Sequence, residues 1–422
     1  MTFSRQTISW ALYDWANSGF AVVVLAGFYP IFFRDYWAVG QDSEQITFYL
    51  GAANSIASVI IVLLAPMMGS IADRGGIRKR LLIVFAGLGL AMTAGLFWVQ
   101  QGEWGIAAAL FVIATVGWMG ANVFYDALLI EVSSEQDFDQ TSALGYGLGY
   151  LGGGLLFALC VLMTLHPDWF WLNDASQAVR ISFLLVALWW AVFSIPLWRF
   201  VHEPGVANAP GFTEAARQGL RQLIQTFHEI RQLKPVLMFL LAYWLYIDGV
   251  DTIIRMAVDY GKAIGFGSQG LITALLITQF IGFPAALMFG WLGGRIGAKR
   301  GILIGIAAYF FITFWAYKMD SEWEFYGLAC CIGLAQGGIQ SLSRSYYARL
   351  IPSDKAAEFF GFYNMLGKFA AIIGPLLVGW TGVMTGSPRI GLLSLLILFT
   401  LGGLLLILTP GQHHHDRPSA PG

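Results

Sequence analysis

Long apolar stretches separated by short polar connections recur along the whole chain. Each stretch holds about 20 residues, which is enough for an α-helix to cross the hydrocarbon core of a bilayer. Uninterrupted runs of this length favour helices over the strands of a membrane β-barrel, in which polar and apolar residues alternate. The pattern predicts an all-α membrane protein with twelve transmembrane helices, at residues 9–33, 49–72, 81–99, 105–130, 143–165, 180–199, 235–261, 269–292, 301–317, 324–348, 359–384 and 390–409.

The composition supports a polytopic membrane protein. Of the 422 residues, 57% are hydrophobic and 12% are charged, and the charged share is about half of the roughly 25% found in soluble domains. A formal net charge of −1 indicates no nucleic-acid partner. The cysteines lie inside apolar runs, so we expect small buried side chains rather than disulfides or metal ligands, and no cofactor. They are Cys160, Cys330 and Cys331.

The Lys and Arg residues predict the orientation of the helices. If the N-terminus is cytoplasmic, the inner connections hold seventeen of them and the outer connections hold five. Cytoplasmic connections of membrane proteins carry such an excess. The inner connection 131–139 has four acids and no base, but acids contribute little to orientation. We therefore expect both termini in the cytoplasm, with the chain in the plasma membrane, the inner membrane of a bacterium.

The longest polar interruption divides the chain into two halves. Residues 201–234 contain a Pro- and Gly-rich turn and then an amphipathic pattern, which predicts a linker helix on the inner membrane surface. Residues 1–200 and 235–410 would each form a bundle of six helices. Residues 411–422 are expected to be a disordered cytoplasmic tail, although the run from His413 to His415 could also bind a metal.

The two halves contain related segments. Gly69 begins the loop GSIADRGGIRKR and Gly290 begins the loop GWLGGRIGAKR, 221 residues later. Tyr125 and Tyr346 lie near the inner ends of the fourth and tenth spans, at the same offset. Repeats of six helices are typical of one transporter architecture.

These loops carry a family resemblance. The loop at 69–80 resembles the signature loop of the major facilitator superfamily. Four further segments resemble the vacuole-effluxer-like family within it: YDWANSGF, GLGYLGGG, GGIQSLSRSYYARLIP and FFGFYNMLGKFAAIIGP. The resemblance implies two pseudo-symmetric six-helix bundles, a monomer, and alternating access to a central cavity lined by the first, fourth, seventh and tenth helices. Fungal members of that family are associated with amino-acid export from the vacuole.

Polar residues within the predicted spans concentrate on the same four helices. Their steps of three and four place each set on one helical face. Charged groups inside a membrane face the protein interior or a water-filled cavity. The sets are Asp14 and Asn17; Asn122 and Asp126; Asp248, Asp251, Arg255 and Asp259; and Gln336, Gln340 and Arg344.

Several of these residues are candidates for contact with a substrate or a coupling proton. Asp248 is the strongest, because it lies near the middle of its span, although Arg255 could simply neutralise it. Lys368 could bind a substrate carboxylate or extend to the inner surface. Asp14 lies near the inner surface, where it could also be a gate or an anchor. The full set is Asp14, Asn17, Asp248, Asp251, Gln340, Asn364 and Lys368.

A second set is predicted to gate the cavity. Asp126 and Arg344 could form a cytoplasmic gate, or each could tie its helix end to the adjacent loop. Arg255 could bridge Asp251 and Asp259 as an outer gate or as a static salt bridge. The signature-loop residues are expected to latch neighbouring helices, and they also serve as positive-inside anchors: Asp73, Arg74, Arg78 and Arg80.

The sequence thus predicts a secondary transporter for a small polar metabolite, with amino acids and proton coupling as the specific hypotheses. A drug or sugar-type carrier is the alternative within the class, and a non-transporting membrane sensor the alternative outside it. No ATP-binding loop, Ser–His pair or metal-ligand spacing indicates an enzyme. The expected partners are a small-molecule substrate, protons and the lipid bilayer.

Overall fold

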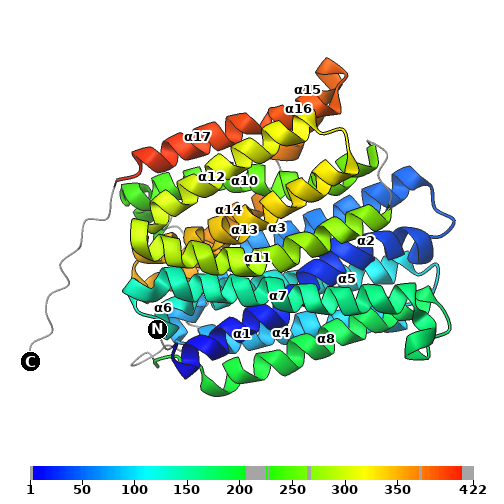
Figure 1. Cartoon of the computed structure of the whole chain (residues 1–422). Helices are drawn as coiled ribbons and strands as arrows, with labels where there is room; N and C mark the ends of the chain where they lie inside the picture. The colour runs from blue at the N-terminus through cyan, green and yellow to red at the C-terminus, as the bar shows by residue number, and fades with distance from the viewer. Residues whose placement is uncertain (1–2, 206–224, 227, 264–267, 370–372, 411–422) are drawn as a thin grey trace, which may run out of the picture.

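The computed structural model describes residues 3–205, 225–226, 228–263, 268–369 and 373–410. Every regular element in these ranges is a helix, and the long helices lie side by side in Figure 1. Helix α1 (Arg5–Gly19) begins and α17 (Leu395–Leu408) ends at the same end of the molecule. We call this the terminal end and the opposite one the far end.

The first half of the chain begins with a long interrupted helix that runs from the terminal end to the far end. After α1, a π-helical stretch continues the same span through apolar residues. The remaining elements of this half are η1 (Phe20–Phe28), α2 (Tyr29–Phe32), η2 (Phe33–Trp37), α3 (Ser43–Gly75), α4 (Arg78–Gly95), η3 (Leu96–Trp98), α5 (Trp104–Ala127), α6 (Leu129–Val132), η4 (Glu135–Asp137), α7 (Phe138–Leu165), η5 (Pro167–Phe170) and α8 (Ala175–Phe200).

The second half is also helical throughout its described residues. Its elements before α17 are α10 (Lys234–Ala263), α11 (Ser268–Ile296), α12 (Ala298–Lys318), α13 (Glu322–Leu350), η6 (Ser353–Lys355), α14 (Ala356–Phe369), α15 (Ile373–Thr385) and α16 (Pro388–Leu393). Most of the predicted linker and the tail with His413 to His415 lie outside the described residues. The predicted domain boundaries therefore stay predictions.

The described parts of all twelve predicted spans lie on helices, with ends that shift by a few residues. Within the described residues, ten helical stretches are long and apolar enough to cross a membrane. The tenth predicted span, α13, is long but carries polar residues. The eleventh is described as two shorter helices, α14 and α15. The structure is consistent with the predicted number of spans.

The halves pack closely near the terminal end, where α3 contacts α14 and α7 contacts α11 and α13. Glycines allow this approach. A Cβ atom on Gly69 would overlap the carbonyl oxygen of Ala357, and one on Gly290 would overlap the side chain of Ala143. The two glycines that the sequence repeat relates therefore lie in related positions, each against the other half of the chain.

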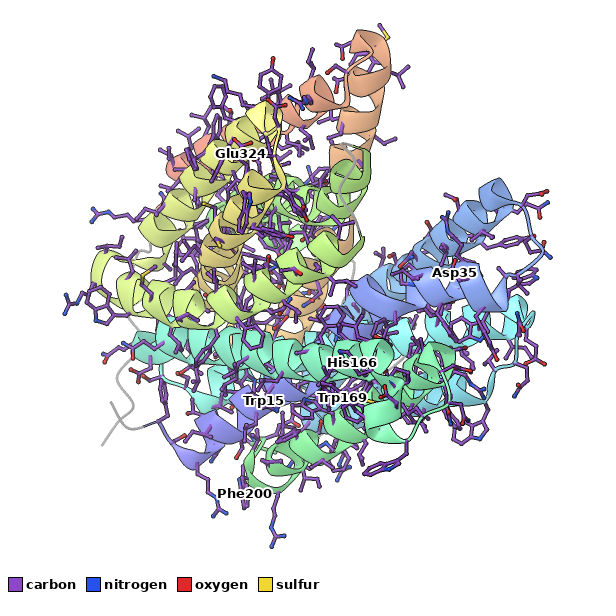
Figure 2. All side chains as sticks on the ribbon, turned by 45° about the vertical axis from the view of Figure 1, so that its right-hand side comes forward. Trp15, Asp35, His166, Trp169, Phe200 and Glu324 are labelled. Atoms are coloured by element: carbon purple, nitrogen blue, oxygen red, sulfur yellow. The ribbon has the colours of Figure 1, made fainter. Side chains whose placement is uncertain are left out.

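The far ends of the two halves diverge. Figure 2 shows Asp35, at the far end of the first half, well apart from Glu324, at the far end of the second half. The backbones of the two halves are thus in contact toward the end that carries the termini and separate toward the opposite end.

The substitution Gly69→Ala tests this close approach. A Gly-to-Ala change inside a helix normally stabilises it by about 0.5–1 kcal/mol, but overpacking at a tight contact costs about 1–3 kcal/mol. We expect Gly69→Ala to lower the apparent melting temperature of the purified protein. Gly51→Ala is the matched control on the same helix, because its Cβ would meet nothing within 4 Å. An equal rise for both variants would contradict the contact.

Candidate functional site

The central feature of the interface is Arg344 of α13, whose residue surface is only 1% exposed. Its guanidinium donates to the first half of the chain with all three nitrogens. Nε donates to Oγ of Ser142 at 2.9 Å, Nη2 donates to the carbonyl oxygen of Ser142 at 2.9 Å, and Nη1 donates to Oδ1 of Asp126 at 3.0 Å. The planar fork of an arginine suits such a set of fixed acceptors. Arg344 therefore ties α13 to both α5 and α7.

A second carboxylate and three aromatic rings surround the same guanidinium. Oδ2 of Asp14, on α1, lies 3.7 Å from Nη1 of Arg344 and accepts the hydroxyl of Tyr125 at 3.2 Å. The guanidinium carbon lies 4.9 Å from the ring of Trp10, 5.2 Å from that of Tyr125 and 4.3 Å from that of Tyr146. Such rings attract a cation through their faces, more strongly where water is excluded.

Asp126 also binds a second helix of the other half. Nδ2 of Asn364, on α14, donates to Oδ2 of Asp126 at 3.0 Å. The sequence left open whether Asp126 and Arg344 meet or each bind their own loop, and the structure brings them together. One carboxylate of α5 thus holds both α13 and α14 of the second half.

The signature loop makes a separate contact between the halves. The carboxylate of Asp73 accepts the backbone N–H groups of Ala357 at 3.0 Å and Glu358 at 2.8 Å, in the first turn of α14. These donors have no acceptor within their own helix, and a negative charge at a helix N-terminus is stabilising. Asp73 therefore holds the beginning of α14 against the end of α3.

Arg78 holds this loop in place. Its Nε lies 2.6 Å from Oδ1 of Asp73, and its Nη1 lies 2.8 Å from Oε1 of Glu131. Nη2 donates to the carbonyl oxygen of Ser353 in the second half at 3.2 Å. The other two predicted loop residues differ: Arg80 is exposed and Arg74 is half-buried.

The acidic connection 131–139 contains contacts that we did not predict. Nη1 of Arg349 lies 2.7 Å from Oδ1 of Asp139, and the hydroxyl of Ser345 also donates to this carboxylate. Together with the contact between Glu131 and Arg78, these pairs match an acidic segment of the first half to basic residues around it. The absence of Lys and Arg from this one inner connection was the signal in the sequence that could have indicated them.

Asp248 of α10 contacts the beginning of α15. Its side chain is fully buried, and its two oxygens accept the backbone N–H groups of Ile373 at 3.1 Å and Gly374 at 3.0 Å, at the beginning of α15. Thr252, one turn further along α10, donates to the same carboxylate at 3.3 Å. The geometry is that of a helix cap supplied by a neighbouring helix.

Other predicted residues are distributed around this core. Nδ2 of Asn17 donates to Asn122 within the first half at 2.7 Å, and Tyr150 of α7 donates to Gln340 of α13 at 3.3 Å. Asp251 is half-buried on α10. The side chains of three predicted residues lie outside the described part of the chain: Arg255, Asp259 and Lys368.

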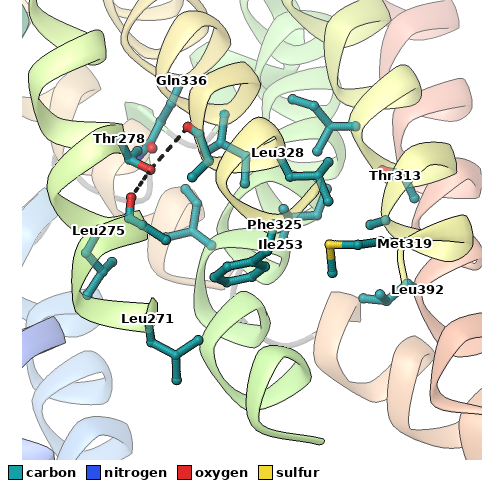
Figure 3. A pocket seen from close by; sticks show the side chains of 16 residues that line it. Ile253, Leu271, Leu275, Thr278, Thr313, Met319, Phe325, Leu328, Gln336 and Leu392 are labelled. Carbon is teal, nitrogen blue, oxygen red and sulfur yellow. Dashed lines mark hydrogen bonds between the residues drawn. The ribbon is translucent and has the colours of Figure 1, made fainter. Parts of the chain in front are cut away.

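A cavity within the second half has a different character. It lies among α10, α11, α12 and α13, and its lining is mostly Leu, Ile and Phe (Figure 3). Gln336 and Thr278 reach its edge, and Thr278 donates to the carbonyl oxygens of Ala274 and Ala329. Few polar groups face this cavity, so it suits an apolar guest better than a polar one.

Removing Arg344 should cost far more stability than removing an exposed arginine. Breaking a buried ion pair leaves uncompensated charge and costs about 3–5 kcal/mol, whereas an exposed pair contributes about 0–1 kcal/mol. We expect Arg344→Ala to lower the apparent melting temperature strongly. The control is Arg389→Ala, because Arg389 pairs with Asp320 at the exposed far end, at 2.6 Å. Equal effects of the two variants would contradict a buried network.

Known proteins share this architecture. The proton:xylose symporter XylE superimposes with a TM-score of 0.70 at 13% identity, over 96% of this chain and 95% of that one. The human organic anion transporter MFSD10 gives a TM-score of 0.68 at 16% identity, over 95% of this chain and 99% of that one. At these identities the likeness shows the fold, which is that of the major facilitator superfamily.

Sequence relatives cover nearly the whole chain. A Bacillus subtilis protein described as an uncharacterized MFS-type transporter, YxiO, is 38% identical over 98% of this chain and 97% of its own length. Autophagy-related protein 22 of Yarrowia lipolytica is 24% identical over 88% of this chain and 77% of its own length. Residues 2–416 match the family described as "Vacuole effluxer Atg22 like". The chain therefore belongs to the Atg22-like vacuole effluxer family, a multi-pass membrane family of the major facilitator superfamily, and is a transporter rather than an enzyme.

Proposed function

We propose that this transporter moves a small polar metabolite, with amino acids as the leading substrate class, by proton-coupled alternating access. The observation that carries the proposal is the buried contact of Arg344 with Asp126 and Ser142, which links the second half to the first. Alternating access requires such a contact to form when one end of the cavity closes and to separate when that end opens.

The chemistry of this contact suits a switch. Taking a guanidinium and a carboxylate out of water costs several kcal/mol per ion, and their mutual attraction roughly offsets this cost. When the terminal end opens, water can solvate both groups again. The closed and open states can therefore lie close in free energy, which lets a substrate or a proton shift the balance between them.

The charged groups around Arg344 match a zwitterionic substrate. Carboxylates of Asp14 and Asp126 can bind an ammonium group, and the guanidinium of Arg344 can bind a carboxylate. The association of fungal family members with amino-acid export supports the same substrate class. The cavity of Figure 3 would instead favour a carrier of apolar compounds, but it lies within the second half rather than between the halves.

The proposed setting follows from charge. The excess of Lys and Arg on the connections at the terminal end supports a cytoplasmic location for both termini, in the plasma membrane. In the described structure this end carries the contacts between the halves, so we take the conformation to be closed toward the cytoplasm. We also propose a monomer, because one chain contains both sides of the contact of Arg344 with Asp126 and Ser142.

Transport can be measured with purified protein in proteoliposomes. We expect at least one radiolabelled amino acid from a panel of amino acids, sugars and drugs to exchange across the membrane and to accumulate in response to a pH gradient. A protonophore should abolish the accumulation but not the exchange. Arg344→Ala should abolish both, whereas Arg389→Ala should retain both. Neither flux nor binding across the panel would contradict the proposal, and flux of drugs or sugars alone would favour the alternative carrier.

The substitution Asp248→Asn distinguishes a structural role of Asp248 at the beginning of α15 from a role in proton coupling. Asparagine has the same shape but one acceptor oxygen, so Asp248→Asn loses one of two backbone contacts at α15 and should cost about 1–2 kcal/mol of stability. We expect the variant to melt earlier and to keep gradient-driven accumulation. Loss of gradient-driven accumulation, with exchange intact, would identify Asp248 as a proton site instead.

A further inference from the structure

Two carboxylates of the first half approach the same nitrogen of Arg344, and they do so unequally. Oδ1 of Asp126 lies 3.0 Å from Nη1, and Oδ2 of Asp14 lies 3.7 Å from it. Asp126 is therefore within hydrogen-bonding distance of Nη1, whereas Asp14 lies beyond it. The other two donor nitrogens of Arg344 are directed to Ser142.

The two carboxylates also differ in how they bind the second half. Asp126 is held by Arg344 and by Asn364, which come from α13 and α14. The hydrogen-bond donors to Asp14 are Tyr125 at 3.2 Å and Ser18 at 3.5 Å, and both belong to the first half. The contact at 3.7 Å with Arg344 thus links Asp14 to the second half of the chain.

From this geometry we propose that Asp14 takes up and releases the coupling proton, while Asp126 remains the fixed counter-ion of Arg344. The assignment rests on the proposed function, and it names the residue that would perform the coupling. The step is a single protonation: one proton from water bonds to a carboxylate oxygen of Asp14, and the same proton returns to water after the terminal end has opened.

The physical reason lies in the crowding of like charges. Two ionised carboxylates beside one nitrogen repel each other, and a low-dielectric setting strengthens this repulsion. A proton on Asp14 removes the repulsion and gives up only the longer of the two contacts with Arg344. A proton on Asp126 would give up the shorter contact and weaken the bond from Asn364.

In the described structure, charged and titratable groups approach Asp14 from several neighbouring helices. Helix α5 presents Asp126 and Tyr125, and α13 presents Arg344. Helix α7 approaches with Gly149, whose Cβ would lie 3.2 Å from Oδ1 of Asp14. It also presents Tyr146 and Tyr150, which both interact electrostatically with Asp14. Lys368 of α14 has its side chain outside the described part, and the proposal does not depend on it.

Protonation would act on the terminal end. With Asp14 ionised, two carboxylates of the first half attract Arg344 and keep the halves together. With Asp14 neutral, Asp126 still attracts Arg344 but the contribution of Asp14 is lost, so the fraction of open molecules rises. A single linked proton changes such an equilibrium by at most about tenfold per pH unit.

Thiol labelling of the terminal end tests this proposal without any substrate. The parent protein has its three cysteines replaced and carries Ala357→Cys, because Ala357 is fully buried where α14 meets α3. The rate of reaction with a polar maleimide is measured between about pH 5 and about pH 8. The ratio of each variant's rate to that of the parent at the same pH cancels the chemistry of the thiol.

For Asp14→Asn we expect a ratio well above one at alkaline pH that falls toward one at acid pH, because the parent itself becomes protonated there. Asp126→Asn should give a ratio above one at every pH. The control Asp320→Asn, which removes an exposed ion pair at the far end, should give a ratio of one throughout. A ratio for Asp14→Asn that does not change with pH would overturn the proposal.

A second variant, Tyr125→Phe, tests the same proposal if Asp14→Asn folds poorly. Tyr125→Phe removes the hydroxyl that donates to ionised Asp14 and keeps the ring that stacks on Trp10 at 4.4 Å. The pH profile of labelling should shift to higher pH, because the ionised carboxylate loses a donor. An unchanged profile would overturn the proposal. The transport assay tests the proposed function separately. If substrate flux is observed but labelling of the terminal end does not depend on pH, the proposed transport function stands and only the proton role of Asp14 is overturned.

Discussion

A guanidinium buried in a membrane protein has to be neutralised where it lies, and Arg344 is neutralised from the opposite half of the chain. Its nitrogens bind Ser142 and Asp126, while Asp14 approaches the same group less closely. Because the charge and its counter-charges belong to different halves, the pair stabilises one arrangement of the halves as well as the fold. Separating the halves at this end without water would leave ions unpaired in a low-dielectric environment. Opening of the terminal end and hydration of this cluster therefore have to occur together.

Other polar contacts between the described parts of the two halves lie in the same part of the molecule. Asp73 binds the first turn of α14, and Asp139 binds Arg349 near the end of α13. Glycines such as Gly69 and Gly290 bring the backbones close enough for these contacts. Small residues make an interface that can separate without removing large side chains from deep pockets. A closed end made of hydrogen bonds and ion pairs over glycine surfaces is consistent with a reversible contact.

Much of this arrangement could be predicted from the sequence because it depends on local periodicity. The apolar runs indicated the spans, and steps of three and four residues placed Asp126 and Arg344 on the faces of two different helices. Which residues meet across helices depends on packing between distant segments. Ser142 and Asp139 were missed for this reason. The prominence of Asp248 was predicted from its depth in the span, whereas its partners at α15 lie 125 and 126 residues away along the chain and could not be predicted from local spacing.

The most direct test of the account is the distance between spin labels at each end of the molecule in lipid nanodiscs. One pair would replace the exposed residues Arg80 and Arg300 at the terminal end, and another would replace Asp35 and Glu322 at the far end. If the buried pair holds the halves together, Arg344→Gln should lengthen the terminal distance and shorten the far distance relative to the parent. Unchanged distances at both ends in a folded Arg344→Gln protein would contradict the account.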